Sequence, residues 1–253
     1  MKASNFLTIL LLITLAACND KAEENGNGFY PISIGTSWNY ECTNYYTSYD
    51  STGKFLKLVH TTELQTTIIT KDTLINGNIL RQFVTTHNVK PTTFSTAVYF
   101  KQDNEGLKQY GYSDYGGTWS LDEIIDSVSQ HATQSAPQRH KVRSNFSDVI
   151  LYKVPFLYIP NSLSDNLDWN YNSGIHKHVV GKDTLHIDGK AYPCYKVETI
   201  EPTEYKFYYE WISNAGLLKC ESESVMNDWV PGDNSYGQYV NHEITIVKSL
   251  NLK

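Results

Sequence analysis

Histidines at alternate positions are the residues of this chain whose spacing most directly suggests chemistry. His176 and His178 flank Lys177, and His186 follows in the same run. Side chains alternate across a β-strand, so these histidines would share one face of an extended segment. Imidazoles in an H-x-H pattern are typical zinc or copper ligands. A metal site at His176 and His178 is therefore one hypothesis for this segment.

The alternative is a polar strand face turned toward water. His178 and His186 lie too far apart along one extended run to bind the same ion without a bend near Gly181. The opposite face is apolar, and we expect it to be buried: Ile175, Val179, Leu185 and Ile187. This interpretation is favoured, and we expect no cofactor.

Catalytic motifs are not found in the sequence. There is no Gly-x-Ser-x-Gly, no phosphate-binding loop and no His-Glu-x-x-His. Glu221 and Glu223 would share a strand face, and Asp122 adjoins Glu123, but such carboxylates usually face solvent. We expect a protein that is not an enzyme, with a hydrolase as the weaker alternative.

Two aromatic clusters are the other candidate binding residues. We place both in or near loops, where exposed rings stack on sugars or on a partner chain. The alternative is ordinary strand composition, since the chain has 19 tyrosines and tyrosine is favoured in strands. The candidate residues are Tyr45, Tyr46, Tyr49, Tyr110, Tyr112, Tyr115 and Trp119.

The N-terminus reads as a secretory leader. Lys2 precedes an apolar run over residues 6–17, which is shorter than the roughly 20 residues that span a bilayer. The run ends in Leu15-Ala16-Ala17-Cys18, which resembles the lipobox of bacterial lipoproteins. The resemblance implies removal of residues 1–17 and acylation of Cys18, which would anchor the chain to a membrane. A plain signal peptide with a chance cysteine is the alternative.

Residues 18–28 are predicted to be the lipidated cysteine and a flexible tether. Asp20, Glu23 and Glu24 lie close behind Cys18. In Bacteroidetes-type lipoproteins an acidic stretch there can act as a surface-export signal, and a solvated linker is the alternative. The formal net charge is −6 and no basic cluster is present, so we expect no nucleic-acid partner.

Three cysteines remain beyond the predicted anchor: Cys42, Cys194 and Cys220. Cys194 and Cys220 are predicted to lie on the outer strands of a three-stranded meander, about 9–10 Å apart. A disulfide needs Cα atoms within about 7 Å, so this pair is disfavoured. Three buried thiols, or one bridge involving Cys42, remain open.

From residue 29 onward the pattern predicts an all-β, antiparallel domain. Runs rich in Thr, Ile, Val, Tyr and Phe are bounded by turn residues. Asn76-Gly77 and Asp188-Gly189 predict tight hairpin turns, because these dipeptides adopt two positive φ angles easily. We expect hairpin and meander sheets that form one curved sheet or a partly closed barrel over residues 29–253.

The strand motifs recur, which indicates two pseudo-repeated halves at about residues 29–117 and 160–223. Convergent turn chemistry is the alternative to duplication. Three patterns occur twice and in the same order: Trp38-Asn39-Tyr40 and Trp169-Asn170-Tyr171, Lys71-Asp72-Thr73-Leu74 and Lys182-Asp183-Thr184-Leu185, and Tyr99 with Asn104, Gly106 and Leu107 against Tyr209 with Asn214, Gly216 and Leu217.

The segment 118–159 is expected to connect the halves. A capping box and helical apolar spacing predict a short helix over residues 120–128. Residues 129–147 are polar and are expected to form a loop. A last strand over residues 239–250 is expected to pair with the first strand and close the sheet.

Gly35, Trp38 and Tyr40 near the start, with Gly216 and Leu217 near the end, resemble β-rich lipoproteins of Bacteroidetes-type bacteria that have no known reaction. The resemblance implies a location in the cell envelope, with the outer membrane expected. The function that we expect is non-catalytic binding of an apolar, glycan or protein ligand. The alternative is a structural or accessory subunit of an envelope complex.

Overall fold

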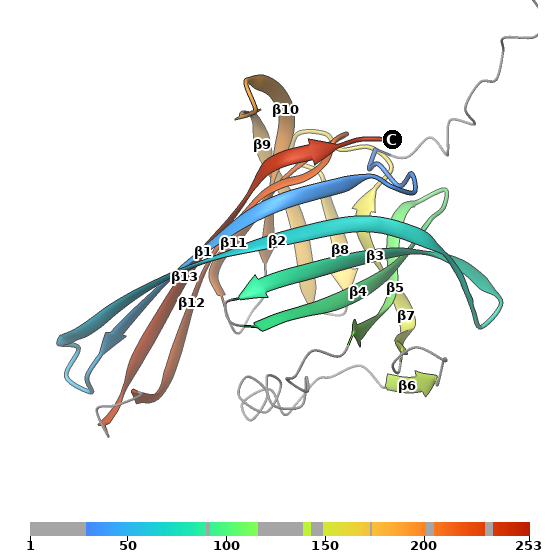
Figure 1. The fold of residues 1–253 in the computed structure, drawn as a ribbon. Coiled ribbons are helices and arrows are strands. Elements are labelled where there is room, and N and C mark those ends of the chain that lie inside the picture. The colour runs from blue at the N-terminus through green and yellow to red at the C-terminus, as the bar shows by residue number, and fades with distance from the viewer. Residues whose placement is uncertain are drawn as a thin grey trace, which may run out of the picture.

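The computed structural model describes residues 29–89, 92–115, 139–142, 149–172, 174–200, 205–230 and 235–253. These residues form one antiparallel sheet of thirteen strands (Figure 1), so the all-β prediction is confirmed. Within these ranges no helix is both long and apolar enough to cross a membrane. The strands are β1 (Ser37–Tyr49), β2 (Phe55–Ile75), β3 (Asn78–Val89), β4 (Thr92–Gln102), β5 (Gly106–Tyr115), β6 (Arg139–Val142), β7 (Val149–Pro160), β8 (Asp168–Asn172), β9 (Ile175–Ile187), β10 (Lys190–Ile200), β11 (Tyr205–Ser213), β12 (Gly216–Val230) and β13 (Ser235–Asn251).

The order of the strands divides the sheet into two similar meanders. The order is β6-β7-β5-β4-β3-β2-β1-β13-β12-β11-β10-β9-β8. Strands β1 to β5 with β7 form one meander, and β8 to β13 form the other. The last strand does pair with the first, as expected, but this pairing lies in the middle of the sheet and does not close it. The duplication of sequence stays a prediction.

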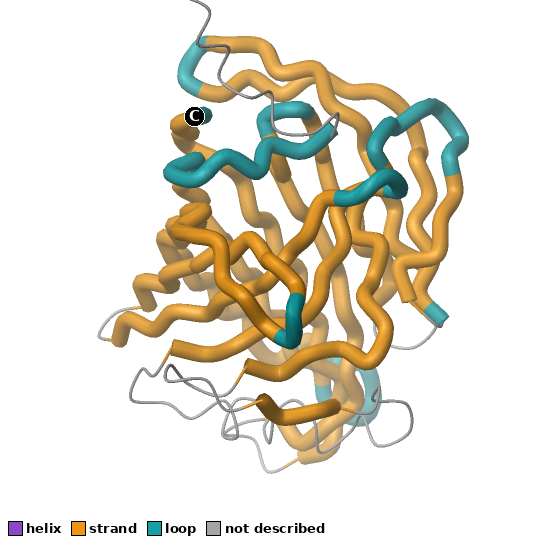
Figure 2. Tube along the Cα trace, turned by 90° about the vertical axis from the view of Figure 1, so that its right-hand side faces the viewer, coloured by secondary structure: helices purple, strands orange, loops and turns teal. Residues whose placement is uncertain are grey.

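The sheet curls so far that its outer strands approach each other, giving a nearly closed barrel (Figures 1 and 2). Strands β7 and β8 face each other there without a shared ladder. The indole Nε1 of Trp169 on β8 donates to the carbonyl oxygen of Leu157 on β7 at 3.2 Å. We call this junction between β7 and β8 the seam.

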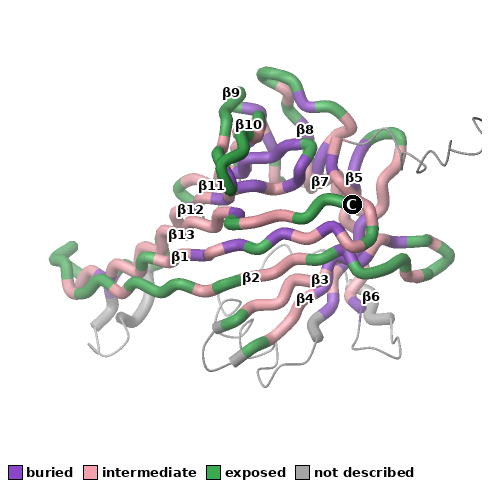
Figure 3. Tube along the Cα trace, turned by 45° about the horizontal axis from the view of Figure 1, so that its top comes forward, coloured by how far each residue is buried: buried purple, intermediate pink, exposed green. Residues whose placement is uncertain are grey.

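Alternation along the strands separates the packed face from the outer face. In β1, Trp38, Tyr40 and Cys42 are buried, whereas Asn39 and Tyr45 between and beyond them are exposed. The strands β1, β2, β12 and β13 extend away from the core as a long ribbon (Figures 1 and 3). The core therefore occupies one end of the curled sheet.

The glycine and tryptophan motifs at the two ends of the chain meet in this core. Trp38 is fully buried, and its Nε1 donates to the Ala215 carbonyl oxygen at 2.7 Å. The Tyr40 hydroxyl donates to the Leu217 carbonyl oxygen at 3.0 Å. Gly216 lies directly against the Trp38 ring with a φ of +105°, so this motif is structural.

Local turn chemistry behaves as predicted. Asn76 and Gly77 have φ angles of 50° and 77°, and Asp188 and Gly189 have 49° and 74°. The positive pairs match the twist of the flanking strands. Each dipeptide joins two neighbouring strands, β2 to β3 and β9 to β10.

The segment 118–159 is more than a connection. It contains β6 and most of β7, so the loop predicted over residues 129–147 is wrong at residues 139–142. The helix predicted over residues 120–128 lies outside the described residues.

The three cysteines are free and buried. Burial raises the pKa of the Cys42 and Cys194 thiols to about 11 and that of Cys220 to about 12. The alternative of three buried thiols is confirmed.

Candidate functional site

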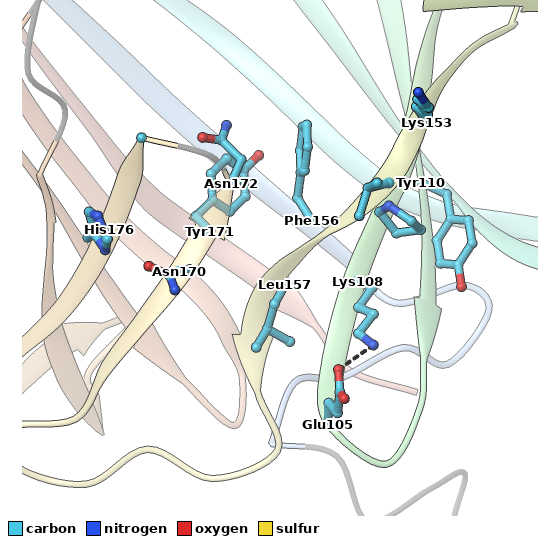
Figure 4. Close-up of a pocket in the computed structure, with 13 residues that line it drawn as sticks. Glu105, Lys108, Tyr110, Lys153, Phe156, Leu157, Asn170, Tyr171, Asn172 and His176 are labelled. Carbon is cyan, nitrogen blue, oxygen red and sulfur yellow. Dashed lines mark ion pairs between the residues drawn. The ribbon is translucent and has the colours of Figure 1, made fainter. Parts of the chain in front are cut away.

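An open cleft of about 1130 Å³ lies along the seam (Figure 4). Strands β5 and β7 form one wall, and β8 and the start of β9 form the other. The first wall contributes Glu105, Lys108, Tyr110 and residues 153–157. The second contributes residues 170–172, Gly174 and His176.

Irregular pairing opens the backbone at the cleft. On β7, Phe156 pairs with Gln109 and Leu151 pairs with Gly111 of β5, so residues 152–155 face Tyr110 alone. Lys153, Val154 and Pro155 in this irregular segment line the cleft. On β8 the register shifts between Asn170 and Asn172. Bulges and proline prevent regular pairing at a strand edge.

Two aromatic rings stand at the centre of the cleft. Phe156 on β7 and Tyr171 on β8 are half-buried, with ring centroids 5.4 Å apart. The Tyr152 ring packs against Phe156, with ring centroids 4.2 Å apart. The Tyr171 hydroxyl donates to Oε1 of Gln109 at 2.9 Å. Both rings are therefore held in place while part of each remains accessible.

Polar side chains line other parts of the cleft. Asn170 and His176 are exposed, and Asn172 is half-buried. On the opposite wall the Lys108 ammonium lies 2.5 Å from Oε2 of Glu105 and 2.9 Å from Oδ2 of Asp103. The hydrogen bonds to Glu105 and Asp103 raise the pKa of Lys108. The cleft can thus offer stacking surfaces together with amide, carboxylate and ammonium groups.

A buried ion pair lies behind the cleft. Lys177 on β9 and Glu210 on β11 form a salt bridge, with side chains only 4% and 3% exposed. The Tyr158 hydroxyl of β7 donates to Oε1 of Glu210 at 3.1 Å. Burial raises the pKa of Tyr158 well above its ordinary value. The sequence prediction missed this pair, although Lys177 shares a strand face with Ile175 and Val179.

The histidine segment lies in β9 with the strand faces that the sequence predicts. The face with Val179 and Ile187 is buried, as expected, and His176 and His186 are exposed. His178 Nδ1 lies 2.8 Å from Oδ1 of Asp168. Within the described ranges no three His, Cys, Asp or Glu side chains are grouped so that they could hold a metal ion.

The first aromatic cluster lies inside a strand. Tyr45, Tyr46 and Tyr49 belong to β1, and only Tyr49, its last residue, adjoins the turn that leads to β2. Tyr45 stacks on His60 with ring centroids 5.0 Å apart. Tyr46 has the opposite orientation and packs near Tyr239 at 6.0 Å. The alternation of the strand separates these rings.

Three residues of the second cluster, Tyr110, Tyr112 and Tyr115, belong to β5. Tyr110 lines the cleft, and Tyr112 packs near Tyr152 at 6.0 Å. Tyr115 ends β5, but its side chain lies outside the described structure, as do Trp119 and Cys18. Phe156 and Tyr171 are the central cleft rings that the sequence prediction missed. Phe156 belongs to an aromatic run in the expected connecting segment, and Tyr171 belongs to the repeated Trp-Asn-Tyr pattern. These two patterns are the sequence features that could have indicated the rings.

No family model matches the chain, and no curated protein matches it significantly. One similar solved structure, from Bacteroides fragilis, is provisionally described as an exported protein with a YmcC-like fold. It has 12% identity and a TM-score of 0.32, and the match covers 88% of this chain and 99% of that one. Another, from Parabacteroides distasonis, is provisionally described as a lipoprotein. It has 13% identity, a TM-score of 0.29 and the same coverages of 88% and 99%. Similarity at this level does not define the function of this chain.

Proposed function

We propose that this chain is a non-catalytic glycan-binding protein of the bacterial envelope, held in the outer membrane by acyl chains on Cys18. The observation that supports binding is the seam cleft, whose lining combines two fixed rings with amide and charged side chains. Ligand sites combine apolar surface with a few placed polar groups in this way. The leader and lipobox support the location.

The cleft favours a glycan over a peptide strand. Strand addition needs a regular edge with free N–H and C=O groups. Both strands at the seam are irregular, since the register of β7 shifts against β5 and that of β8 shifts against β9, and Pro155 has no N–H to donate. Recognition by side chains is therefore favoured, and sugar hydroxyls pair well with Asn170, Asn172 and Glu105.

The packed core argues against a large apolar ligand inside the sheet. Trp38 stacks on Phe83 at a centroid distance of 6.3 Å, and Phe83 contacts Phe100 at 4.8 Å. These side chains are buried and fill the space that a carrier would leave empty for its ligand.

Calorimetric titration of the full-length lipidated protein in detergent would test the proposal. The probes are cello-, xylo-, manno- and chito-oligosaccharides. We expect at least one series to bind, and Phe156→Ala to weaken that binding by at least about fivefold, the loss of a residue that contributes more than 1 kcal/mol. Tyr45→Ala, on the outer face of the ribbon, is the control. Binding that is equally strong in Phe156→Ala would contradict the proposal.

An accessory subunit is the second candidate, and the ribbon supports it. Phe55, Leu58 and Leu64 on β2 are 55%, 56% and 57% exposed, and Met226 on β12 is 52% exposed. Exposed apolar side chains in this number suit a protein contact. Affinity purification from envelope membranes should then recover a defined partner with the wild type and not with Leu58→Ser/Leu64→Ser.

A further inference from the structure

The seam is held by side chains where the rest of the sheet is held by ladders. Trp169 donates to a β7 carbonyl across it, and Tyr171 reaches Gln109 of β5. Tyr158 of β7 reaches Glu210 behind the cleft. A few directional contacts therefore determine how far apart the two cleft walls lie.

Lys177 contacts both walls at once. Its Nζ lies 4.6 Å from the ring centroid of Tyr158, on β7, and 5.2 Å from that of Tyr171, on β8. An ammonium over aromatic faces is attracted to each ring, and more strongly where water is excluded. One buried cation thus links a ring from each side of the seam.

Glu210 holds that cation in place. One carboxylate oxygen accepts from Tyr158 and the other is paired with Lys177. A buried charge must keep its partners, because the low-dielectric interior makes an unpaired one costly. The three groups therefore tie β7, β9 and β11 to one another. We call Tyr158, Lys177 and Glu210 the seam clasp.

We propose that Lys177 and Glu210 are positioning residues that set the separation of β7 and β8 and so the width of the ligand cleft. Neither residue lines the cleft, and they act through Tyr158 and Tyr171. The effect on a ligand rests on the proposed glycan function, whereas the effect on the seam does not. Replacing the pair by neutral groups removes the clasp without leaving an unpaired charge.

The test is a distance measurement across the seam by pulsed electron paramagnetic resonance. Spin labels are placed at Val154→Cys and Val180→Cys on the full chain, both positions being exposed. Cys42, Cys194 and Cys220 are buried with raised pKa values, so they should stay unlabelled near neutral pH. The labelled protein is the lipidated form, in which the predicted acyl chain on Cys18 blocks the fourth thiol. In the otherwise native chain we expect a narrow distribution of distances between the two labels. In Lys177→Met/Glu210→Gln we expect a broader distribution with a longer mean distance.

Two variants separate positioning from general stability. Lys196→Met removes a cation that lies 3.7 Å from the Tyr209 ring centroid, away from the seam, and should leave the distribution narrow. Lys177→Arg keeps the positive charge, and its distance distribution should be as narrow as that of the chain with native Lys177 and Glu210. Circular dichroism of each variant checks that the strands are retained. A folded double variant with an unchanged distance distribution would overturn the proposal, and so would a folded Lys177→Met single variant with an unchanged one.

The sugar titration distinguishes the two proposals. If a probe sugar binds the native chain, we expect the double variant to bind it roughly tenfold more weakly, a loss of about 1.4 kcal/mol. A changed seam with no sugar bound by the native chain supports the clasp and contradicts the glycan function. If the double variant keeps both the native distance distribution across the seam and the native sugar affinity, the result contradicts the positioning role of Lys177 and Glu210 and leaves the glycan function standing.

Discussion

Replacing Gly216 by alanine should destabilise the protein because of one specific contact. A methyl group built on Gly216 would lie 2.7 Å from Nε1 of Trp38 and 2.8 Å from two ring carbons. The ring cannot retreat, because it is fully buried and its Nε1 is bound to the Ala215 carbonyl oxygen at 2.7 Å. The backbone at Gly216 also has a φ of +105°, which side chains rarely adopt.

The magnitude follows from two costs. A non-glycine residue at positive φ costs about 1–2 kcal/mol, and forcing extra volume into a packed core costs about 1–3 kcal/mol. The sum is about 2–5 kcal/mol, a large share of the roughly 5–15 kcal/mol that stabilises a folded protein. At about 2–4 °C per kcal/mol for a chain near this size, Tm should fall by roughly 4–20 °C.

Gly53→Ala is the matched control for this prediction. Gly53 has a φ of +81°, but nothing lies within 4 Å of the added methyl group, so it should show only the conformational cost. Denaturant unfolding of both variants, with tryptophan fluorescence as the probe, gives the two free energies of unfolding. Equal losses in Gly216→Ala and Gly53→Ala would refute the argument that the Trp38 ring requires glycine.

Three further predictions concern thiols, the anchor and a carboxylate. Burial raises the pKa of Cys220 to about 12. Above pH 9 the Cys220 thiol therefore loses its proton in the unfolded chain but keeps it in the folded chain, and the free energy of unfolding falls as pH rises. Cys220→Ala should reduce that fall by about 2 kcal/mol at roughly pH 10.5 in denaturant titrations, and parallel pH curves would contradict this. Cys18→Ala should move the protein out of the membrane fraction and abolish palmitate labelling, whereas retention of both would exclude the lipid anchor. The hydrogen bond from His87 lowers the pKa of Glu63, so His87→Ala should raise it in a carboxyl NMR titration. The stabilisation that ionised Glu63 contributes is lost as pH falls through the pKa of Glu63 in the folded chain. An unchanged Glu63 pKa in His87→Ala would show that His87 does not lower that pKa.

Local chemistry was the predictable part of this fold. Asn76-Gly77 and Asp188-Gly189 adopt their turns because the preference belongs to the dipeptide itself. The alternation of His176 to Ile187 correctly assigned the buried face because a strand has a fixed period of two.

The cleft could not be predicted in the same way. Phe156 belongs to a run that contains Pro155, and proline weakens any strand prediction. Its neighbour Tyr171 comes from another strand, and only the curl of the whole sheet brings the two rings together. Lys177 received no role in the sequence prediction, because its partner, Glu210, lies on a strand that is distant in sequence.

The placement of β13 beside β1 bears on how the chain assembles. Within each meander the ladders join strands that are neighbours in the sequence, apart from β5 with β7, so each meander can begin to form before β13 is available. The ladder that joins the two meanders pairs β1 with β13, the final seventeen-residue strand. A chain that has not released its C-terminus would leave β1 and β12 with open edges, the state most prone to mispairing with another molecule. The ladder between the two meanders therefore cannot form until the last strand of the chain is available.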